Sequence, residues 1–455
     1  MSLHEELALV ASAVPESIAG FRERLDEAWI AKALQASGVA TVRRRRLPAE
    51  QVIWLVLGMA IMRDRRIEEV VTKLDLALPV PSGKTVAPSS IPEARERVGS
   101  APVAWLFSET ASLWAAEGAD EQRWRRLAVY GVDGSTLRVP DSPENREQFG
   151  GQWAGAAKGD SGYPMVRVLA LMALRTHVLA GAVLGGYGKT SEQGMARDLL
   201  KQVPDHSLTV LDRNFLSPLS LYPLTRDGTN RHWLIRAKSN TAMTTLEKLG
   251  EGDELVELKV SGEAREKDPS LPTTWSARAI RYQRKGFRPQ ILLTSLLDPI
   301  RYPAAELVEM YHERWELELG FDEVKTDLLE REEAIRSKKP DNVLQELWGI
   351  LLAYNLVRLE IARVAKQVGV PPTRISFVLA LSLIRDEWIW STISTSPGAI
   401  PKHLLRLRQN LQRLVLPPRR SGRTYPRAVK VKMSNYARKR PPAAPTKPNA
   451  ESQDP

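Results

Sequence analysis

Cysteine is absent from the 455-residue chain, and histidine occurs only six times. The absence of cysteine excludes a disulfide framework, a thiol nucleophile and a zinc site built on cysteine. No two histidines stand four residues apart, which is the spacing of a zinc-binding helix. Carboxylates are therefore the side chains left to bind any catalytic metal, and oxygen ligands favour Mg²⁺ or Mn²⁺.

Long apolar runs are also scarce near the N-terminus. The longest there, Val52 to Met62, has 11 residues, whereas a membrane-spanning helix needs about 20. The first residues, MSLHEELALVASAVPE, carry acidic side chains where an export signal carries basic ones. The sequence therefore predicts a cytoplasmic protein with no membrane partner.

Acidic side chains are outnumbered, because 54 Asp and Glu stand against 65 Lys and Arg, a net charge of +11. Such an excess favours a polyanionic partner, although charge alone does not identify which one. Residues 417–440 hold nine Lys or Arg and no acid. We expect residues 417–455 to form a basic, disordered tail.

The first part of the chain, residues 1–122, has apolar residues at helical spacing and predicts a separate helical domain. Another helix is predicted from Ser90, where a capping box places Arg95 and Arg97 exposed on successive turns. It is either a helix that enters a DNA groove or an ordinary surface helix. Four consecutive arginines are either phosphate contacts or a solvated approach to a helix: Arg43, Arg44, Arg45 and Arg46.

Residues 123–225 change to short runs that are typical of β-strands. This order of elements, three strands, a helix and a fourth strand, is that of a ribonuclease-H-like α/β core. The predicted elements are residues 127–132, 165–174, 178–184, 191–203 and 208–211.

The core is expected to be interrupted and then completed. Alternating apolar residues predict a mainly β insertion over residues 226–300. The core resumes over residues 301–416, with one helix from Pro303 to about Glu330. Two further helices, at about 342–366 and 371–391, are apolar on most faces.

Two aspartates directly follow predicted strands. Asp133 comes after the apolar run that ends at Val132, and Asp212 comes after the strand that ends at Leu211. Sites in α/β sheets form where strands end, so the pair indicates a site more strongly than either residue alone. The sequence does not show that the two strands are neighbours, and for Asp133 an Asp-Gly turn is the alternative.

The predicted helix from Pro303 carries a polar face. At 100° per residue, an arc of about 60° holds a phenol, a guanidinium, a carboxylate and an ammonium: Tyr311, Arg314, Glu318 and Lys325. Asp322 lies on the same face, so periodicity leaves Glu318 and Asp322 as candidates for a third carboxylate. A solvated face with paired charges is the alternative. Three further acids of this helix lie on other faces: Glu313, Glu316 and Glu323.

These motifs resemble those of the insertion-element-4 family of bacterial transposases, in the DDE superfamily. The family spacing Tyr-x₂-Arg-x₃-Glu-x₆-Lys is met in full by the helix within YHERWELELGFDEVK, and it selects Glu318 over Asp322. The first aspartate motif looks like Asp133-Gly134-Ser135, and the second like Asp212-Arg213-Asn214-Phe215. Asn214 departs from the glycine that many members have there. The interrupted core and the RRRRLPAEQVIW segment are also similar to the family.

The resemblance implies a DNA transposase with a DDE motif on a ribonuclease-H-like core. Asp133 would bridge two Mg²⁺ or Mn²⁺ ions, with Asp212 on one and Glu318 on the other. The protein would bind the terminal inverted repeats of an insertion element as a homodimer in a synaptic complex. It would cut the DNA and join the 3′-OH ends to target DNA, with or without a hairpin intermediate. The residues expected to contact DNA near the cut are Tyr311, Arg314, Lys325 and Arg213.

In this family an aromatic side chain of the insertion stacks on a flipped base, a contact worth roughly 1–3 kcal/mol. Trp233, Trp275 and Tyr282 are the candidates. Two other functions remain open: a nuclease of the same fold that cuts but does not join DNA, and a non-catalytic DNA-binding descendant. A glycosidase based on a carboxylate pair does not explain the basic tail.

Overall fold

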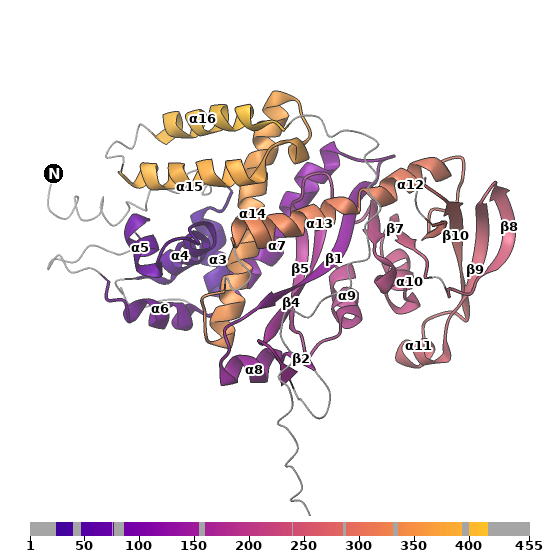
Figure 1. Ribbon diagram of the computed structural model, residues 1–455, viewed down its shortest axis with the longest axis horizontal. Helices are drawn as coiled ribbons and strands as arrows, with labels where there is room; N and C mark the ends of the chain where they lie inside the picture. The colour runs from indigo at the N-terminus through magenta and orange to yellow at the C-terminus, as the bar shows by residue number, and fades with distance from the viewer. Residues whose placement is uncertain are drawn as a thin grey trace, which may run out of the picture.

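The computed structural model describes residues 24–39, 47–74, 76, 86–153, 160–238, 240–284, 288–330, 335–393 and 400–416. The four-arginine run at 43–46 and the basic tail at 417–455 lie outside the described residues. The described part is an elongated α/β molecule: helices gather at one end, a sheet runs through the middle and further strands form the other end (Figure 1). None of its helices has the length and apolarity that a membrane span requires.

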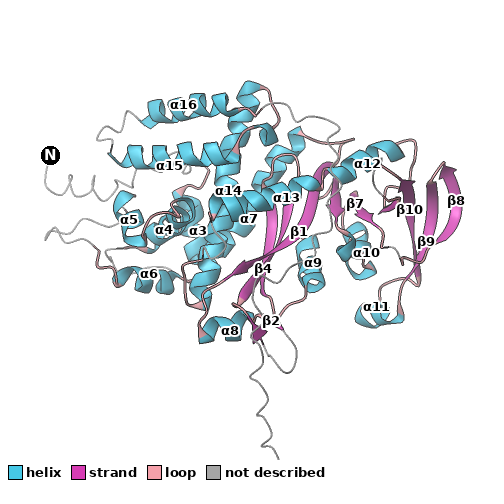
Figure 2. Ribbon diagram, in the orientation of Figure 1, coloured by secondary structure: helices cyan, strands magenta, loops and turns pink. Residues whose placement is uncertain are grey.

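A nine-stranded mixed sheet has the order β5-β4-β1-β6-β7-β11-β10-β9-β8 (Figure 2). β1 pairs antiparallel with β4 and β4 with β5, whereas β6 runs parallel to β1 and β7 parallel to β6. This arrangement is consistent with the ribonuclease-H-like core that the sequence predicts. The five strands are β1 (Ala128–Arg138), β4 (Met165–Ala173), β5 (Leu179–Gly186), β6 (Ser207–Leu211) and β7 (Arg231–Arg236).

The insertion extends this sheet instead of forming one of its own, because β11 pairs antiparallel with β7. The buried guanidinium of Arg278 ties the insertion together: it donates to both carboxylate oxygens of Asp253 and to the carbonyl of Tyr302. The elements are β8 (Thr244–Gly250), β9 (Asp253–Lys259), α11 (Gly262–Lys267), β10 (Thr274–Tyr282) and β11 (Gln290–Thr294).

The prediction that the first strand ends at Val132 is wrong. β1 continues to Arg138 and keeps its antiparallel pairing with β4 beyond Asp133. Its apolar run stops because the second half of the strand is only partly buried, so polar side chains are tolerated there. Asp133 therefore lies inside a strand and is not part of an Asp-Gly turn.

One long helix, α14 (Pro340–Val368), runs through the helical end of the molecule (Figure 1). It packs against α4 and α7, and the three helices contribute to the same hydrophobic core as the sheet. The division between an N-terminal domain and the core at residue 122 stays a prediction. The other helices at this end are α3 (Glu27–Ala36), α4 (Ala49–Ile61), α5 (Ile67–Lys73), α6 (Ser90–Val98), α7 (Ala101–Glu121), α15 (Phe377–Ile393) and α16 (Ile400–Leu411).

The single helix predicted from Pro303 to Glu330 is in fact interrupted. Its segments are α12 (Ala304–His312), α13 (Trp315–Asp322) and a π-helical turn, η3 (Glu323–Leu328). By contrast, α9 (Glu192–Leu200) starts as expected, since Ser191 accepts a hydrogen bond from the N–H of Gly194. The remaining short elements are α8 (Pro143–Phe149), β2 (Gln152–Trp153), β3 (Asp160–Ser161) and α10 (Pro218–Arg226).

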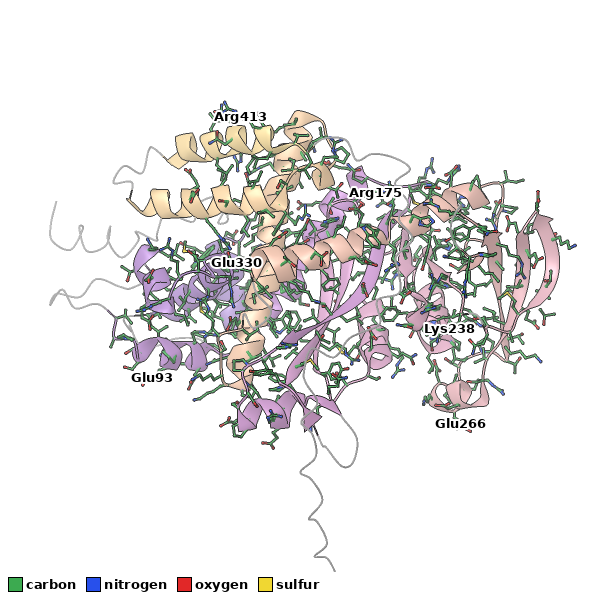
Figure 3. The ribbon with its side chains drawn as sticks, in the orientation of Figure 1. Glu93, Arg175, Lys238, Glu266, Glu330 and Arg413 are labelled. Carbon is green, nitrogen blue, oxygen red and sulfur yellow. The ribbon has the colours of Figure 1, made fainter. Side chains whose placement is uncertain are left out.

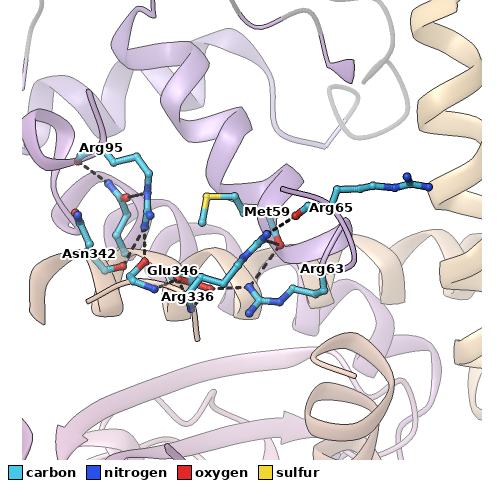
Figure 4. Close-up of polar contacts among 9 residues, drawn as sticks. Met59, Arg63, Arg65, Arg95, Arg336, Asn342 and Glu346 are labelled. Atoms are coloured by element: carbon cyan, nitrogen blue, oxygen red, sulfur yellow. Dashed lines mark hydrogen bonds and ion pairs between the residues drawn. The ribbon is translucent and has the colours of Figure 1, made fainter. Parts of the chain in front are cut away.

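The prediction that Arg95 is exposed on a capped helix is also wrong. No side chain caps α6, and only 4% of Arg95 is exposed. Its guanidinium donates to Gln345, Ser337 and the carbonyl of Asn342 (Figure 4). The residue therefore joins α6 to the start of α14 and is not available to enter a DNA groove.

The same cluster contains a buried carboxylate, Glu346 of α14 (Figure 4). Arg63 donates to it at 2.6 Å, and the N–H groups of Arg336 and Ser337 donate at 3.0–3.2 Å. Burial opposes its ionisation, but the charges of Arg63 and Arg95 hold the pKa of Glu346 below its usual value. The carboxylate thus balances two buried cations where α4, α6 and α14 meet.

Glu346→Gln should lower the free energy of unfolding by about 3–5 kcal/mol, because it leaves buried arginines without their counter-charge. Urea unfolding at pH 7 measures the loss. The matched control is Glu96→Gln, since Glu96 pairs with Lys339 at the surface and an exposed pair is worth at most about 1 kcal/mol. A loss at position 346 no larger than the control loss contradicts this account.

The loss of unfolding free energy caused by Glu346→Gln should also depend on pH. A carboxyl with a lowered folded-state pKa stabilises the fold fully above its unfolded pKa, about 4.3, and less as the pH falls through its folded-state pKa. The difference between wild type and Glu346→Gln should therefore narrow below about pH 4. A difference that widens on acidification has the wrong sign.

Candidate active site

The parallel register of β1 and β6 brings two aspartates together. Val132 is the partner of Leu211, and each aspartate is the next residue along its strand. β6 ends at Leu211, and Asp212 opens the short 3₁₀ turn η2 (Arg213–Phe215). Asp133 and Asp212 therefore lie side by side at the edge where β6 stops and β1 continues.

A third carboxylate reaches this edge on α13, which packs against β1 and β4. A Cβ on Gly131 would lie 2.7 Å from Leu317 Cδ1, and a Cβ on Gly320 would lie 2.4 Å from Met172 Cε. A larger residue at either position would therefore force Leu317 or Met172 to move, and glycine lets helix and sheet approach closely. Leu317 and Gly320 are the buried residues of α13, and Glu318 lies between them, partly exposed.

The charges of Asp212 and Glu318 act on the ionisation of Asp133. Burial raises the pKa of Asp133, and the charges of Asp212 and Glu318 raise it further. The N–H of Gly134, which donates to Asp133 Oδ1 at 2.8 Å, and the charge of Arg314 act in the opposite direction. The site therefore concentrates negative charge that is only partly balanced.

Arg314 is the cation closest to this charge. Its Nη2 donates to Glu318 Oε1 at 2.8 Å, one helical turn away. Asp322, the other candidate acid on this face, is exposed, and its charge acts on Asp327 in the π-helical turn. The structure thus groups Glu318, and not the exposed Asp322, with the two strand aspartates.

The other residues of the helix face differ in burial. Tyr311 is only 6% exposed, and burial raises its pKa to about 12, with the charge of Asp212 adding to the effect. Lys325 is partly exposed and lies in η3, where the π-helical geometry no longer follows 100° per residue. Arg213 is exposed directly beside Asp212.

Sequence reasoning missed Arg236. Ile235 of β7 pairs with Leu211 of β6, so Arg236 follows its partner as Asp212 follows Leu211. Its charge also lowers the pKa of Tyr311 against the larger effect of burial. The only signal in the sequence was a basic residue at the end of an apolar strand.

The three aromatic residues predicted to stack on a base are also placed differently, and one of them, Trp233, lies on β7 of the core. Trp233 is 1% exposed and packs against Trp275, with ring centroids 5.4 Å apart. Tyr282 is partly exposed and lies edge-on to His312, which follows Tyr311. Of the three, Tyr282 borders the helix that carries the polar face.

The donor chemistry of the site fits a hard divalent cation, since three carboxylates offer oxygen ligands and excess negative charge. As they stand, however, no three His, Cys, Asp or Glu side chains among the described residues are close enough to hold a metal ion together. Glu318 is paired with Arg314 instead. Binding a cation would therefore require Glu318 to change partner.

Comparison with known proteins agrees with the motifs. A family described as "Insertion element 4 transposase N-terminal" matches residues 15–108, and one described as "Transposase DDE domain" matches residues 125–356. The chain is 38% identical over 424 residues to "Transposase InsG for insertion sequence element IS4" of Escherichia coli (strain K12), covering 93% of each chain. It is 40% identical over 234 residues to "Putative transposase InsZ" of the same organism, covering 51% of this chain and 76% of that protein.

A solved structure with a similar outline is the "piggyBac transposase synaptic complex with hairpin DNA". It matches 90% of this chain and 87% of its own, at 13% identity and a TM-score of 0.41. So distant a likeness carries no argument about the site.

Proposed function

The chain belongs to the insertion element 4 family of transposases, and from that premise we propose that it is a metal-dependent DNA transposase whose catalytic acids are Asp133, Asp212 and Glu318. It would bind the terminal inverted repeats of an insertion element, cut the DNA and join the freed 3′-OH ends to target DNA. The observation that supports this assignment is the parallel register that sets Asp133 beside Asp212 under the helix of Glu318. The core that carries them is, on this proposal, ribonuclease-H-like.

The three carboxylates are proposed to hold two Mg²⁺ or Mn²⁺ ions, with Asp133 shared between them. When bound, such ions activate water and stabilise the charge that develops at phosphorus and on the leaving oxygen. Asp133 suits the shared position because its pKa is raised by burial and by both neighbouring acids, an effect that added positive charge would oppose.

Arg314 has two roles in this proposal. It balances Glu318 in the metal-free chain, and once a cation takes over that task its guanidinium is free to hold a DNA phosphate by a bidentate contact. Lys325 and Arg213, both at least partly exposed near the site, supply further phosphate contacts. Tyr311 is proposed to reach DNA only through its small exposed part.

The remaining proposals concern partners. We assign the stacking of a flipped base to Tyr282, because Trp233 is buried and Tyr282 borders the polar face of the helix. The protein would act as a homodimer that pairs two ends, and would associate with the nucleoid. Residues 1–122 are proposed to contribute to end binding, including the arginines at 43–46.

The catalytic assignment predicts that Asp133→Asn, Asp212→Asn or Glu318→Gln each abolishes Mg²⁺-dependent cutting of a duplex that carries the element's end sequence. The loss should exceed about 10³-fold, because each change removes a metal ligand from the site. Cutting is measured on labelled duplex by gel, and DNA affinity on the same duplex should stay within about threefold.

The matched control for Glu318→Gln is Asp322→Asn, four residues along the same segment. Asp322 is exposed, and its replacement should leave cutting nearly unchanged. Full cutting by Glu318→Gln would remove Glu318 from the site, and loss only in Asp322→Asn would transfer the role to Asp322.

The basic segment gives a separate prediction. A chain that ends at Leu416 loses the nine Lys or Arg of residues 417–440. It should bind DNA more weakly and with a shallower dependence on salt, because fewer counterions are released. Titration of end duplex at several salt concentrations measures the slope, and an unaltered slope refutes a role for the tail in binding.

A further inference from the structure

Three further carboxylates belong to the α12–α13–η3 segment: Glu313 at the break after α12, Glu316 in α13 and Glu323 at the start of the π-helical turn. Within α13, Glu316 lies about 160° around the helix axis from Glu318. Each of the three carboxylates contacts a residue of the turn 174–178 between β4 and β5: Arg175 contacts Glu313, and His177 contacts Glu316 and Glu323.

Arg175 of this turn binds the first carboxylate. Its Nε and Nη2 donate to the two oxygens of Glu313 at 3.0 and 2.8 Å, and its Nη1 donates to the carbonyl of Gln122 at 2.7 Å. In Figure 3, Arg175 lies at the end of the sheet, beside the junction of α12 and α13. Its two-point contact fixes Glu313, which stands at the break between these helices.

His177 of the same turn binds the second carboxylate. The residue is 1% exposed and has a φ of 61°, which non-glycine residues seldom adopt. Its Nε2 lies 2.9 Å from Glu316 Oε2, and Arg358 of α14 lies 2.6 Å from its Nδ1. Because a carboxylate can only accept, Nε2 donates to Glu316.

The third carboxylate, Glu323, begins the π-helical turn. Tyr354 donates to it at 2.8 Å, and Arg358 also donates to it. Burial acts to raise its pKa, but the charges of Arg358 and His177 lower it to about 2. Glu323 is therefore held as an anion at the other end of α13.

Apolar packing alone holds α13 weakly. The helix has eight residues, of which only Leu317 and Gly320 are buried. It is bounded by the break at Glu313 and by the π-helical turn that starts at Glu323, and each of these irregular points is held by a charged contact. The rotation and height of α13 over the sheet, and so the position of Glu318, depend on these contacts.

We propose that the β4–β5 turn is the positioning element of the active site: Arg175 and His177 hold Glu313 and Glu316, and thereby fix α13 so that Glu318 lies at the sheet edge that carries Asp133 and Asp212. The inference deepens the proposed function and rests on it. Arg175, His177, Glu313 and Glu316 are positioning residues, because they act through the backbone of α13.

The test uses the full chain with Glu316→Ala and, separately, Arg175→Met. Mn²⁺ binding is measured by electron paramagnetic resonance without DNA, and the Mg²⁺ concentration for half-maximal cutting is measured with end duplex. Both variants should bind Mn²⁺ about tenfold more weakly and need correspondingly more Mg²⁺, as is usual when a group that orients a metal ligand is lost. DNA affinity should remain within about threefold. Glu316→Gln, which still accepts from His177, should recover most of the metal affinity.

The matched control is Glu309→Ala on α12, because Glu309 is exposed and pairs with Arg284 at the surface. It should change neither metal measurement. Arg175 is partly exposed, so Arg175→Met keeps the test decisive if Glu316→Ala fails to fold.

The outcomes separate the two proposals. If Glu318→Gln weakens Mn²⁺ binding but Glu316→Ala and Arg175→Met do not, the positioning role is overturned and the proposed function stands. If Glu316→Gln is as impaired as Glu316→Ala, or Glu309→Ala is equally impaired, the positioning role is also overturned. If Glu318→Gln leaves both Mn²⁺ binding and cutting intact, the proposed site itself is wrong.

Discussion

The parallel pairing of β1 with β6 is the constraint on which the rest of the site depends. It places Asp133 and Asp212 at equivalent positions of neighbouring strands, and it ends one residue before each of them. Because β1 continues beyond this point while β6 does not, the edge is open beside β1 and α13 packs across it. The helix approaches the sheet closely at two glycines, Gly131 under Leu317 and Gly320 over Met172. A shift of one residue in this register would turn Asp133 to the opposite face of the sheet.

The long helix α14 connects this site to the helical end of the molecule. Near its start, Glu346 balances two buried arginines, Arg63 just after α4 and Arg95 of α6. Two to three turns later, Tyr354 and Arg358 hold Glu323 at the end of the segment that carries Glu318. The same helix therefore contacts both the N-terminal helices and the segment that carries Glu318.

The elements that the sequence predicted well were those with local signals. The strands of the core followed from apolar runs, and Ser191 was recognisable as the cap of α9. Helical periodicity did not distinguish Glu318 from Asp322 as the third carboxylate, and the family motif was needed to select Glu318. The angle that periodicity assigned to Lys325 does not apply, because a π-helical turn does not follow 100° per residue. The exposure of Arg95 was predicted wrongly for a different reason. Its helix position suggested exposure, but the side chain is buried because it donates to Gln345 and Ser337, which are 240 or more residues away in the sequence. Contacts between residues so far apart in the sequence leave no local pattern. The contacts of Arg175 with Glu313 and of His177 with Glu316 could not be predicted for the same reason.

The central claim is that Asp133, Asp212 and Glu318 form one metal centre. Its most direct test is the position of Mn²⁺, found by anomalous scattering in crystals of the full chain with DNA that carries the element's end. The account predicts one ion in contact with Asp133 and Asp212 and a second ion in contact with Asp133 and Glu318, or a single ion in contact with all three. In either case Arg314 is no longer paired with Glu318. Manganese held by Asp322, or bound away from Asp133, would contradict it.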